Sequence, residues 1–466
     1  MMGSLSVPES IDSPHREARA AGMLFLAFAL AGGLSFLFVT PPLGSPDEEV
    51  HLARALLISE GQWWAPGEAP WARAEIPRSL VRLLHVMRHA PPNAPPRTFE
   101  ASELRSLVAD PLDPEITVPA RYLGYYPPLA YLPQAAALWL ARRVAPSPIV
   151  LVYAGRLGNL LAYTAMGWLA IALTPLRRWS LCLLLLTPMS VAQAASLSAD
   201  APTLSIAALF FSLTCRIGFG TKPLGRNSHV GLLLAAGGLG LVKPGYWILS
   251  CAPLLTPPAR FPDPAARRFV LAGCLLAAVL PSALWMAIVA ASQPFSASPV
   301  ADAPAQLSYV IAHPLDFAGI LLRTIASGIP MYVETFVGRL GHLNIPLPTW
   351  LWIAFPGALI ASALADRPDP PELDAWRRSA LVALFALGAV GILLLAHLGW
   401  NAVGAHRIQG VQGRYFTPLA PLLLLAFPAR GGRLSDAVRA RLVGTAAFVG
   451  LATSLSALWQ GFFGSR

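Results

Sequence analysis

The sequence predicts an all-α, polytopic bundle of transmembrane helices, and three observations carry that prediction. Hydrophobic residues make up 55% of the 466 positions and charged residues only 12%, whereas soluble domains carry about 25% charged residues. The mean hydropathy is +0.56. Many apolar runs approach the roughly 20 residues that a membrane-spanning helix needs. Together these features predict a polytopic membrane protein.

The N-terminal region predicts a tail followed by an anchor. Residues 1–19 are polar and are expected to form a cytoplasmic tail before a first helix at about 20–40. Arg16 and Arg19 precede this apolar run, as in a signal peptide. The run is too long for a signal peptide, however, and no A-x-A cleavage site follows it. We therefore expect an uncleaved anchor, with residues 20–466 forming a single transmembrane domain.

The longest polar segment, residues 41–121, is rich in Pro and Arg and lacks the core of a separate domain. We expect short juxtamembrane helices here, in a first outer loop covering residues 41–148. The run at 127–144 contains three prolines and ends at two arginines. By itself this run is compatible with a spanning helix or with an interfacial one.

The basic residues decide between these alternatives. Ten later apolar runs are expected to span, at 150–174, 178–197, 201–217, 229–242, 245–257, 269–292, 349–364, 379–399, 415–428 and 442–462. If residues 127–144 do not span, six short segments on one side of the membrane hold 17 of the 34 Lys and Arg residues, whereas the short connections near 200, 243 and 400–413 on the other side hold only Lys243 and Arg407. The positive-inside rule then predicts about 11 spans with a cytoplasmic N-terminus and an outer C-terminus. It also places a second long outer loop at 293–348.

The strongest functional signal is a polar stretch directly after the first apolar run. Asp47 and Glu48 follow Pro46, and His51 and Arg54 lie within the next two turns of a predicted helix. The carboxylates would face the positive end of that helix. One interpretation is an N-capped surface helix. The other is a catalytic acidic loop, in which one carboxylate is a general base and the other anchors a loop or a cation.

Two single residues are predicted to lie on the same side of the membrane. Asp200, two residues before Pro202, is either a helix N-cap or a functional carboxylate. Lys243 precedes Pro244 and Gly245, which break the helix. It is either a snorkelling loop lysine or a charge that faces a cavity or an anion.

The segment 406–415 combines two glycines with the polar side chains of His406, Arg407, Gln412, Arg414 and Tyr415. Glycine lets backbone N–H groups approach an anion, and Arg binds phosphate through two hydrogen bonds. This composition predicts a phosphate cradle, and the alternative is a solvated loop. The net charge of +10 needs no nucleic-acid partner, because anionic membrane lipid and positive-inside loops explain it.

Several motifs together resemble a known family. They are Pro-Asp-Glu-Glu-x-His-x-x-Arg-Ala at 46–55, Tyr125-Tyr126-Pro-Pro-Leu, Ser-Ala-Asp at 198–200 and Gly-Val-Gln-Gly-Arg-Tyr-Phe-x-Pro at 410–418. Over about residues 20–430 the chain is similar to the bacterial predicted membrane proteins grouped as domain of unknown function 2142. That group in turn resembles the GT-C glycosyltransferase superfamily in architecture.

The resemblance implies a multi-pass enzyme of the bacterial inner (plasma) membrane with a GT-C-like fold. Such an enzyme transfers a sugar, with inversion, from a polyprenyl-phosphate sugar to a saccharide, lipid or protein acceptor. Asp47 or Glu48 would be the catalytic base and Asp200 the second acidic position. We expect the remaining site residues in two groups, with His51, Arg54, Tyr125 and Tyr126 in support and Lys243, His406, Arg407, Gln412, Arg414 and Tyr415 at the donor phosphate.

Two questions stay open at this stage. The acidic pair is Asp-Glu rather than Asp-x-Asp, so Asp47 and Glu48 either bind a divalent cation (Mg²⁺ or Mn²⁺) or act without one. The function also has two competing interpretations. A transporter or flippase of lipid-linked saccharides would use the same basic residues without needing Asp47, and a structural subunit of an envelope assembly would leave the clustered polar residues unexplained.

Overall fold

Long apolar helices dominate the computed structural model, as the composition predicts. The structure describes residues 13–63, 73–87, 90, 94–107, 110–113, 115–121, 124–220, 226–292, 298, 300–429 and 434–464. Within these ranges, seven helices contain a segment long and apolar enough to cross a membrane. They are α1 (Ser13–Val39), α6 (Pro148–Leu173), α9 (Asp200–Phe219), α11 (Pro264–Ser292), α13 (Pro314–Val337), α15 (Ala375–Trp400) and α17 (Asp436–Phe463).

Shorter apolar helices complete the bundle. They are α7 (Arg178–Leu185), α8 (Pro188–Ala194), α10 (Arg226–Val242), α14 (Thr349–Leu364), α16 (Ala420–Ala426) and the 3₁₀ helices η3 (Tyr246–Leu255), η4 (Pro258–Arg260) and η5 (Gly413–Leu419). The runs at 178–197, 245–257 and 415–428, each expected to be one spanning helix, are thus divided or wound as 3₁₀ helix. Pro188, Pro253 and Pro418 lie at these irregular places, where proline removes a helical hydrogen bond. The count of 11 spans stays a prediction.

The first polar segment forms short elements, as expected, together with a small sheet that was not expected. The elements are α2 (Glu48–Ser59), β1 (Arg73–Pro77), α3 (Arg78–Val86), α4 (Ala101–Ser106), β2 (Thr117–Arg121), η2 (Pro128–Tyr131) and α5 (Leu132–Val144). β1 and β2 pair antiparallel. With 13 residues, α5 is too short to span. It packs on α6, where a Cβ on Gly158 would lie 2.6 Å from the carbonyl oxygen of Pro133.

The segment 293–348 is not the plain loop that the sequence predicted. Among its described residues it holds α12 (Ala303–Ala312), the 24-residue α13, and the short antiparallel pair β3 (Arg339–Leu340) and β4 (Ile345–Pro346). Pro314 stands in the first turn of α13, where proline suits a helix start. Charged residues interrupt the apolar pattern of α13, and they hid the helix from a search for continuous apolar runs.

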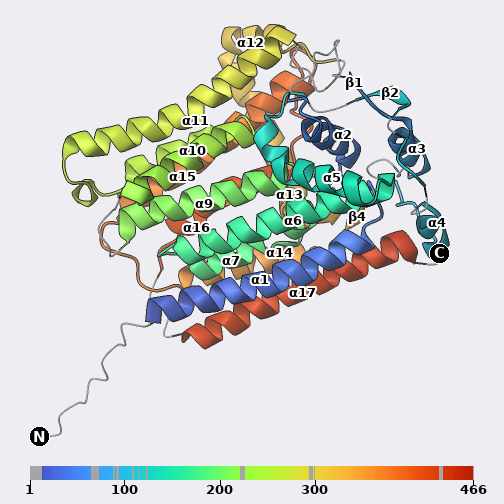
Figure 1. The fold of residues 1–466 in the computed structure, drawn as a ribbon. Coiled ribbons are helices and arrows are strands. Elements are labelled where there is room, and N and C mark those ends of the chain that lie inside the picture. Colours follow the sequence, from blue (N-terminus) through green and yellow to red (C-terminus); the bar gives the residue numbers. More distant parts are fainter. Residues whose placement is uncertain are drawn as a thin grey trace, which may run out of the picture.

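The connections between helices gather at two ends of the bundle (Figure 1). The site end carries residues 41–55, 196–200, 243–246 and 401–415. The opposite end carries residues 174–178, 256–263, 365–374 and 427–436. Ion pairs join segments of the opposite end that are remote in sequence, such as Arg178 with Glu17 at 3.1 Å and Arg367 with Asp436 at 3.2 Å. The two ends correspond to the two sides that the basic residues predicted, and the assignment of the opposite end to the cytoplasm stays a prediction.

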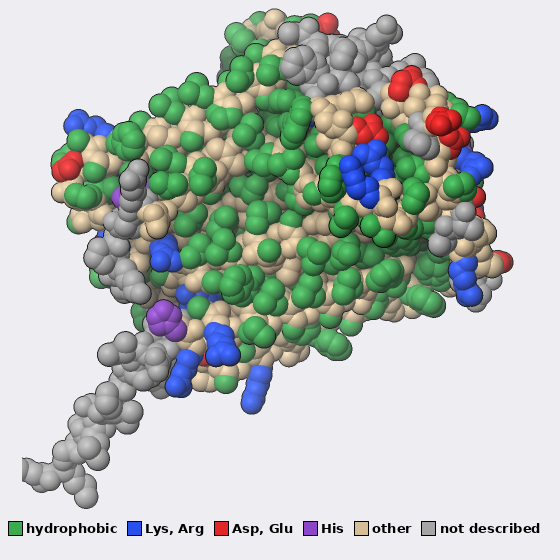
Figure 2. Space-filling model, in the orientation of Figure 1, with side chains coloured by type: hydrophobic (Ala, Val, Ile, Leu, Met, Phe, Trp, Pro, Cys, Tyr) green, Lys and Arg blue, Asp and Glu red, His purple; other side chains and the backbone are tan. Residues whose placement is uncertain are grey.

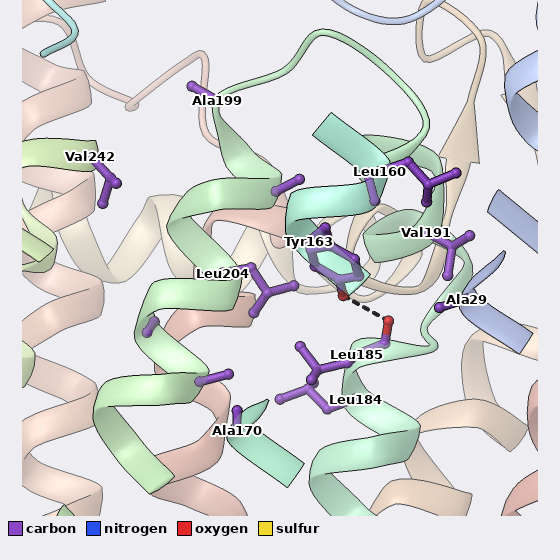
Figure 3. Close-up of a cluster of buried hydrophobic side chains, with 14 of the residues drawn as sticks. Ala29, Leu160, Tyr163, Ala170, Leu184, Leu185, Val191, Ala199, Leu204 and Val242 are labelled. Atoms are coloured by element: carbon purple, nitrogen blue, oxygen red, sulfur yellow. Dashed lines mark hydrogen bonds between the residues drawn. The ribbon is translucent and has the colours of Figure 1, made fainter. Parts of the chain in front are cut away.

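The core lies between α1, α6, α7, α8 and α9. Figure 3 shows part of it, with the Tyr163 ring between Leu160, Leu185 and neighbouring apolar side chains. The Tyr163 hydroxyl donates a hydrogen bond of 2.7 Å to the carbonyl oxygen of Leu185, so its polar atom is satisfied inside apolar surroundings. In Figure 2, hydrophobic side chains cover the middle of the visible face and charged side chains gather toward its ends. This distribution is the one that a membrane-spanning bundle requires.

Candidate functional site

The two predicted catalytic carboxylates, although adjacent in sequence, lie in opposite environments. Asp47 is exposed and adopts a left-handed backbone conformation, with φ of 57°. It precedes α2 without forming a side-chain capping hydrogen bond within the described part of the chain. Glu48 is completely buried. Because the left-handed residue turns the chain sharply, one carboxylate can face outward while the next faces the core.

Glu48 forms a fully buried, bidentate ion pair with Arg156 of α6. Arg156 Nε lies 2.8 Å from Glu48 Oε1, and Nη2 lies 2.6 Å from Oε2. The guanidinium also donates to three backbone carbonyls at the end of α1, those of Leu37, Thr40 and Pro41. Burying two charges is costly unless their hydrogen bonds are made, and here they are made on both sides. Glu48 therefore anchors the loop and is not open to a substrate.

The same ion pair connects the acidic loop to the segment that precedes Asp200. Glu48 Oε1 accepts a hydrogen bond from the backbone N–H of Leu197 at 3.2 Å. One turn beyond Arg156 along α6, the Asn159 amide donates to three backbone carbonyls of this region, those of Gln193, Ser196 and Ser198. Two polar residues of α6 thus fix the position from which Asp200 begins α9.

Asp200 holds two cations, one on each carboxylate oxygen. Lys243 Nζ lies 2.8 Å from Oδ1, and Arg414 Nε lies 3.4 Å from Oδ2. The three side chains are 17%, 14% and 5% exposed respectively. Burial alone would lower the pKa of Lys243 and of Arg414, but neighbouring groups including Asp200 raise both above their usual values. Both side chains therefore stay cationic.

Tyrosine rings surround the cations. The Lys243 ammonium lies 4.6 Å from the ring centre of Tyr415 and 5.1 Å from that of Tyr126. The guanidinium carbon of Arg414 lies 5.4 Å from the Tyr415 ring centre. The Tyr246 hydroxyl donates to the backbone carbonyl of Tyr415 at 2.8 Å. These cation–π contacts stabilise positive charge in a partly desolvated place.

His51 interacts electrostatically both with Asp47 and with the cluster that Asp200, Lys243 and Arg414 form with the surrounding tyrosines. The imidazole is buried, its Nδ1 lies 2.8 Å from the Tyr131 hydroxyl, and its ring is nearly parallel to that of Tyr126. Burial lowers the pKa of His51 to about 4, so the ring is neutral near pH 7. The carboxylates of Asp47 and Asp200 both raise that pKa. The two carboxylates therefore lie within electrostatic reach of one ring, although one is exposed and the other is paired.

Arg54 positions the two predicted supporting tyrosines. Its guanidinium is fully buried and donates to the backbone carbonyl of Tyr126 at 3.2 Å and to that of Trp63 at 2.9 Å. It also lies 5.7 Å from the ring centre of Trp285. The Trp285 indole N–H donates to the backbone carbonyl of Tyr125. Arg54 therefore supports the aromatic wall of the site.

The predicted phosphate cradle divides into exposed and buried parts. His406 and Arg407 are exposed on the loop surface, while Arg414 and Tyr415 belong to the cluster. Gly413, between the two parts, lies so close to α13 that an added Cβ would fall 1.7 Å from the Tyr332 carbonyl oxygen. Its N–H donates to the Thr335 hydroxyl at 2.6 Å. A side chain here would displace Arg414.

A small cavity lies beside the cluster, with polar lining from Ser190, Gln193, Asp200, Tyr246, Arg414 and Thr417. Arg414 Nη1 and Gln193 Oε1 are buried and have no hydrogen-bond partner among the described residues, and the same holds for Gln412 Oε1 in the preceding loop. Buried polar atoms are rarely left unpaired. Arg414 Nη1 is a donor that suits an anionic oxygen, whereas the two amide oxygens are acceptors that suit a hydroxyl or N–H group of a ligand.

No group of three or more His, Cys, Asp or Glu side chains that could hold a metal ion occurs in the described ranges. Both oxygens of Glu48 are taken by Arg156. Of the acidic pair proposed for Mg²⁺ or Mn²⁺, only Asp47 is therefore accessible to a cation.

Sequence analysis missed the residues that build the framework of the site. Arg156, Asn159, Tyr131 and Trp285 were not singled out. The signal for Arg156 was present, because an arginine inside an apolar run is expected to have a specific role.

The fold and the site define a class of protein: a polytopic helical membrane protein with charged residues clustered at one end of the bundle. Residues 30–423 match the model of the family described as Predicted membrane protein (DUF2142), and the chain belongs to this family. No curated protein and no solved structure matches the chain.

Proposed function

We propose that this protein is a glycosyltransferase that moves a sugar from a polyprenyl-phosphate donor to an acceptor at the membrane surface. The proposal takes its reaction class from the resemblance to the GT-C superfamily. The acceptor is a saccharide, lipid or protein with a free hydroxyl group. The site end would then face the outer side of the membrane.

The observation that carries the proposal is the pairing of Lys243 and Arg414 on Asp200, with an exposed Asp47 within electrostatic reach of Arg414. Asp200 engages one nitrogen of each cation, and Arg414 Nη1 has no hydrogen-bond partner in the described ranges. A phosphate oxygen can therefore bind without breaking the cluster. Charged hydrogen-bond donors held in place in this way stabilise negative charge that develops on a leaving group.

In the proposed reaction Asp47 accepts the proton of the acceptor hydroxyl. The hydroxyl oxygen attacks the anomeric carbon of the sugar from the face opposite the phosphate. As the new C–O bond forms, the bond between the anomeric carbon and the phosphate oxygen breaks, and its electron pair stays on the phosphate. Lys243 and Arg414 bind that phosphate, and the anomeric configuration inverts. Glu48 holds the loop in place and takes no proton.

The experiment uses the full-length protein in liposomes with a radiolabelled polyprenyl-phosphate sugar and a hydroxyl acceptor. Asp47→Asn keeps the shape of the side chain but removes the proton acceptor. Since general-base catalysis contributes about 10²–10⁴-fold, transfer should fall by that factor while donor binding is retained. Parallel reactions with Mg²⁺, Mn²⁺ or a chelator test whether Asp47 needs a divalent cation.

Glu49→Gln, two residues further on in the first turn of α2, is the matched control and should transfer at close to the wild-type rate. Two outcomes would contradict the proposal. One is full transfer by Asp47→Asn. The other is wild-type protein that moves the intact donor across the bilayer without cleaving it, which would favour the transporter or flippase interpretation.

A further inference from the structure

We propose that α13 does not cross the membrane but lies in the plane of the membrane interface at the site end, where its outer face binds bilayer lipid. Its length and composition allow a span. Three features of the structure argue for the in-plane arrangement instead: the pattern of its side chains, the place of its two ends, and its contact with the loop that carries Arg414. The inference is independent of the proposed enzymatic activity.

The side chains of α13 form three separate stripes. Leu315, Leu322 and Ile329, spaced by seven residues, are 86%, 69% and 54% exposed. Residues at this spacing lie on one face of a helix. A second stripe, Asp316, Arg323 and Ser327, is exposed and polar. The third stripe, Ile320, Thr324 and Thr335, is buried against the protein.

Each stripe fits a different environment at the interface. The buried stripe contacts the protein, the apolar stripe suits the acyl region, and the polar stripe suits water and lipid headgroups. In a spanning helix at the edge of the bundle, Asp316 and Arg323 would face hydrocarbon without a partner among the described residues, which is costly. The in-plane arrangement removes that cost.

Three contacts spread along α13 are with residues of the site end. Near its start, the Phe317 ring stacks on His397 in the last turn of α15, with ring centres 5.7 Å apart. In its middle, the Thr324 hydroxyl accepts a hydrogen bond from the N–H of Ile408 at 3.0 Å. Near its end, the Thr335 hydroxyl accepts from the N–H of Gly413. A helix crossing the bundle would instead carry one of its termini to the opposite end.

In this arrangement α13 connects the lipid surface directly to Arg414, the candidate phosphate-binding residue. Gly413 is in contact with the backbone of Tyr332 and Phe336 in α13, and Arg414 is the next residue. The depth of α13 in the interface therefore sets the height of Arg414 relative to the lipid phosphates. The partner is the bilayer itself, through acyl chains at the apolar stripe and headgroups at Arg323.

The test measures the membrane depth of spin labels in the full-length protein. Cysteines replace Leu315, Leu322 and Ile329 one at a time in a Cys251→Ser background, because the other native cysteines are buried. The protein is reconstituted into phosphatidylethanolamine–phosphatidylglycerol vesicles. Relative accessibility to oxygen and to a water-soluble nickel chelate gives the depth of each label. All three labels should lie in the acyl boundary within about one helical turn, ~5 Å, of one another.

The matched control is a set with the same spacing on α17, Leu442, Val449 and Ser456, which are all exposed. If α17 spans, at least one neighbouring pair of these labels should differ in depth by about 10 Å, the rise of seven helical residues. Labels replacing Asp316 and Arg323 should be reached by the nickel chelate. Steps of about 10 Å along α13, or all three apolar-stripe labels in water, would overturn the proposal.

Discussion

The two ends of the bundle both carry buried charges but use them differently. At the opposite end, Asp369 contacts Arg177 at 2.7 Å and Arg378 at 2.7 Å and accepts the N–H of Ala429 at 2.8 Å. Arg177 also donates to two backbone carbonyls that follow α16 or lie within it. At the site end, Asp200 holds Lys243 and Arg414 by one nitrogen each.

The two ends differ in how the guanidinium nitrogens of their buried arginines are paired. Arginines of the opposite end close helix termini and pair with carboxylates, so their charge stabilises the bundle. Arg177 Nη1 lacks a hydrogen bond in the described ranges, but it lies 2.7 Å from Asp369 Oδ1 and is ion-paired there. At Arg414, Nε makes the approach to Asp200, Nη1 has no hydrogen-bond partner in the described part of the chain, and the residue lines a small cavity. A buried guanidinium nitrogen that borders a cavity and has no hydrogen-bond partner, rather than buried charge alone, therefore marks the candidate binding site. Four variants, three of them with a matched control, test how the buried charges are used.

The largest effect on stability should come from Arg156→Met, in the framework beneath the site. Removing one partner of a fully buried ion pair costs about 3–5 kcal/mol, because Glu48 would remain charged without a partner. Denaturant unfolding in detergent measures the change.

The control for this variant is Arg82→Met. Arg82 pairs with Asp110 at 2.9 Å, but the two side chains are 58% and 41% exposed, so the cost should stay below about 1 kcal/mol. Equal, small losses in the two variants would mean that the buried pair does not hold the acidic loop.

Acid should weaken the site end through His51. Burial lowers its pKa from 6.5 to about 4 in the folded protein, so below pH 6.5 the unfolded state binds more protons than the folded state. Stability should then fall as the pH drops from about 6.5 to 4, by about 3 kcal/mol in total. Thermal unfolding across this range measures the slope. His51→Gln keeps a polar group near Tyr131, and its slope should be flatter. An unchanged slope would remove His51 as the cause.

A variant of the opposite end should change stability and nothing else. Asp369→Asn weakens charged hydrogen bonds to Arg177 and Arg378, worth about 1.5–3 kcal/mol. Binding of polyprenyl phosphate should stay at the wild-type level. Asp374→Asn, at a 50% exposed carboxylate that pairs with Arg377, is the control and should cost less than about 1 kcal/mol. Weaker lipid binding in Asp369→Asn would show that the two ends are not separate in function.

The features that depend on local composition could be predicted from the sequence alone. The apolar runs gave the helical membrane class, and the basic residues predicted which connections lie together, because both signals are read within a few neighbouring residues. The motifs also pointed to the correct family. Charge pairing was not accessible in this way. Glu48 and Arg156 are 108 positions apart, and no local pattern indicates that the two side chains meet.

The remaining misses have physical reasons of the same kind. Arg407 and Arg414 look equivalent in the sequence, and only burial against α13 and Asp200 separates them. The helix α13 escaped detection because its polar stripe interrupts the apolar runs. The strands β1 and β2 come from two segments separated by about forty residues. In neither segment do apolar and polar residues alternate clearly enough to predict a strand.

The most direct test of the difference between the two ends is the binding of a short-chain polyprenyl phosphate to Arg414→Met and Arg378→Met, both full length and in nanodiscs. Both arginines pair with a carboxylate in the structure. If Arg414 donates to the lipid phosphate, its loss should weaken binding about tenfold or more, since one charged hydrogen bond is worth about 1.5–3 kcal/mol. Arg378→Met should bind like the wild type. Equal affinity in the two variants, whether weakened or unchanged, would contradict the account.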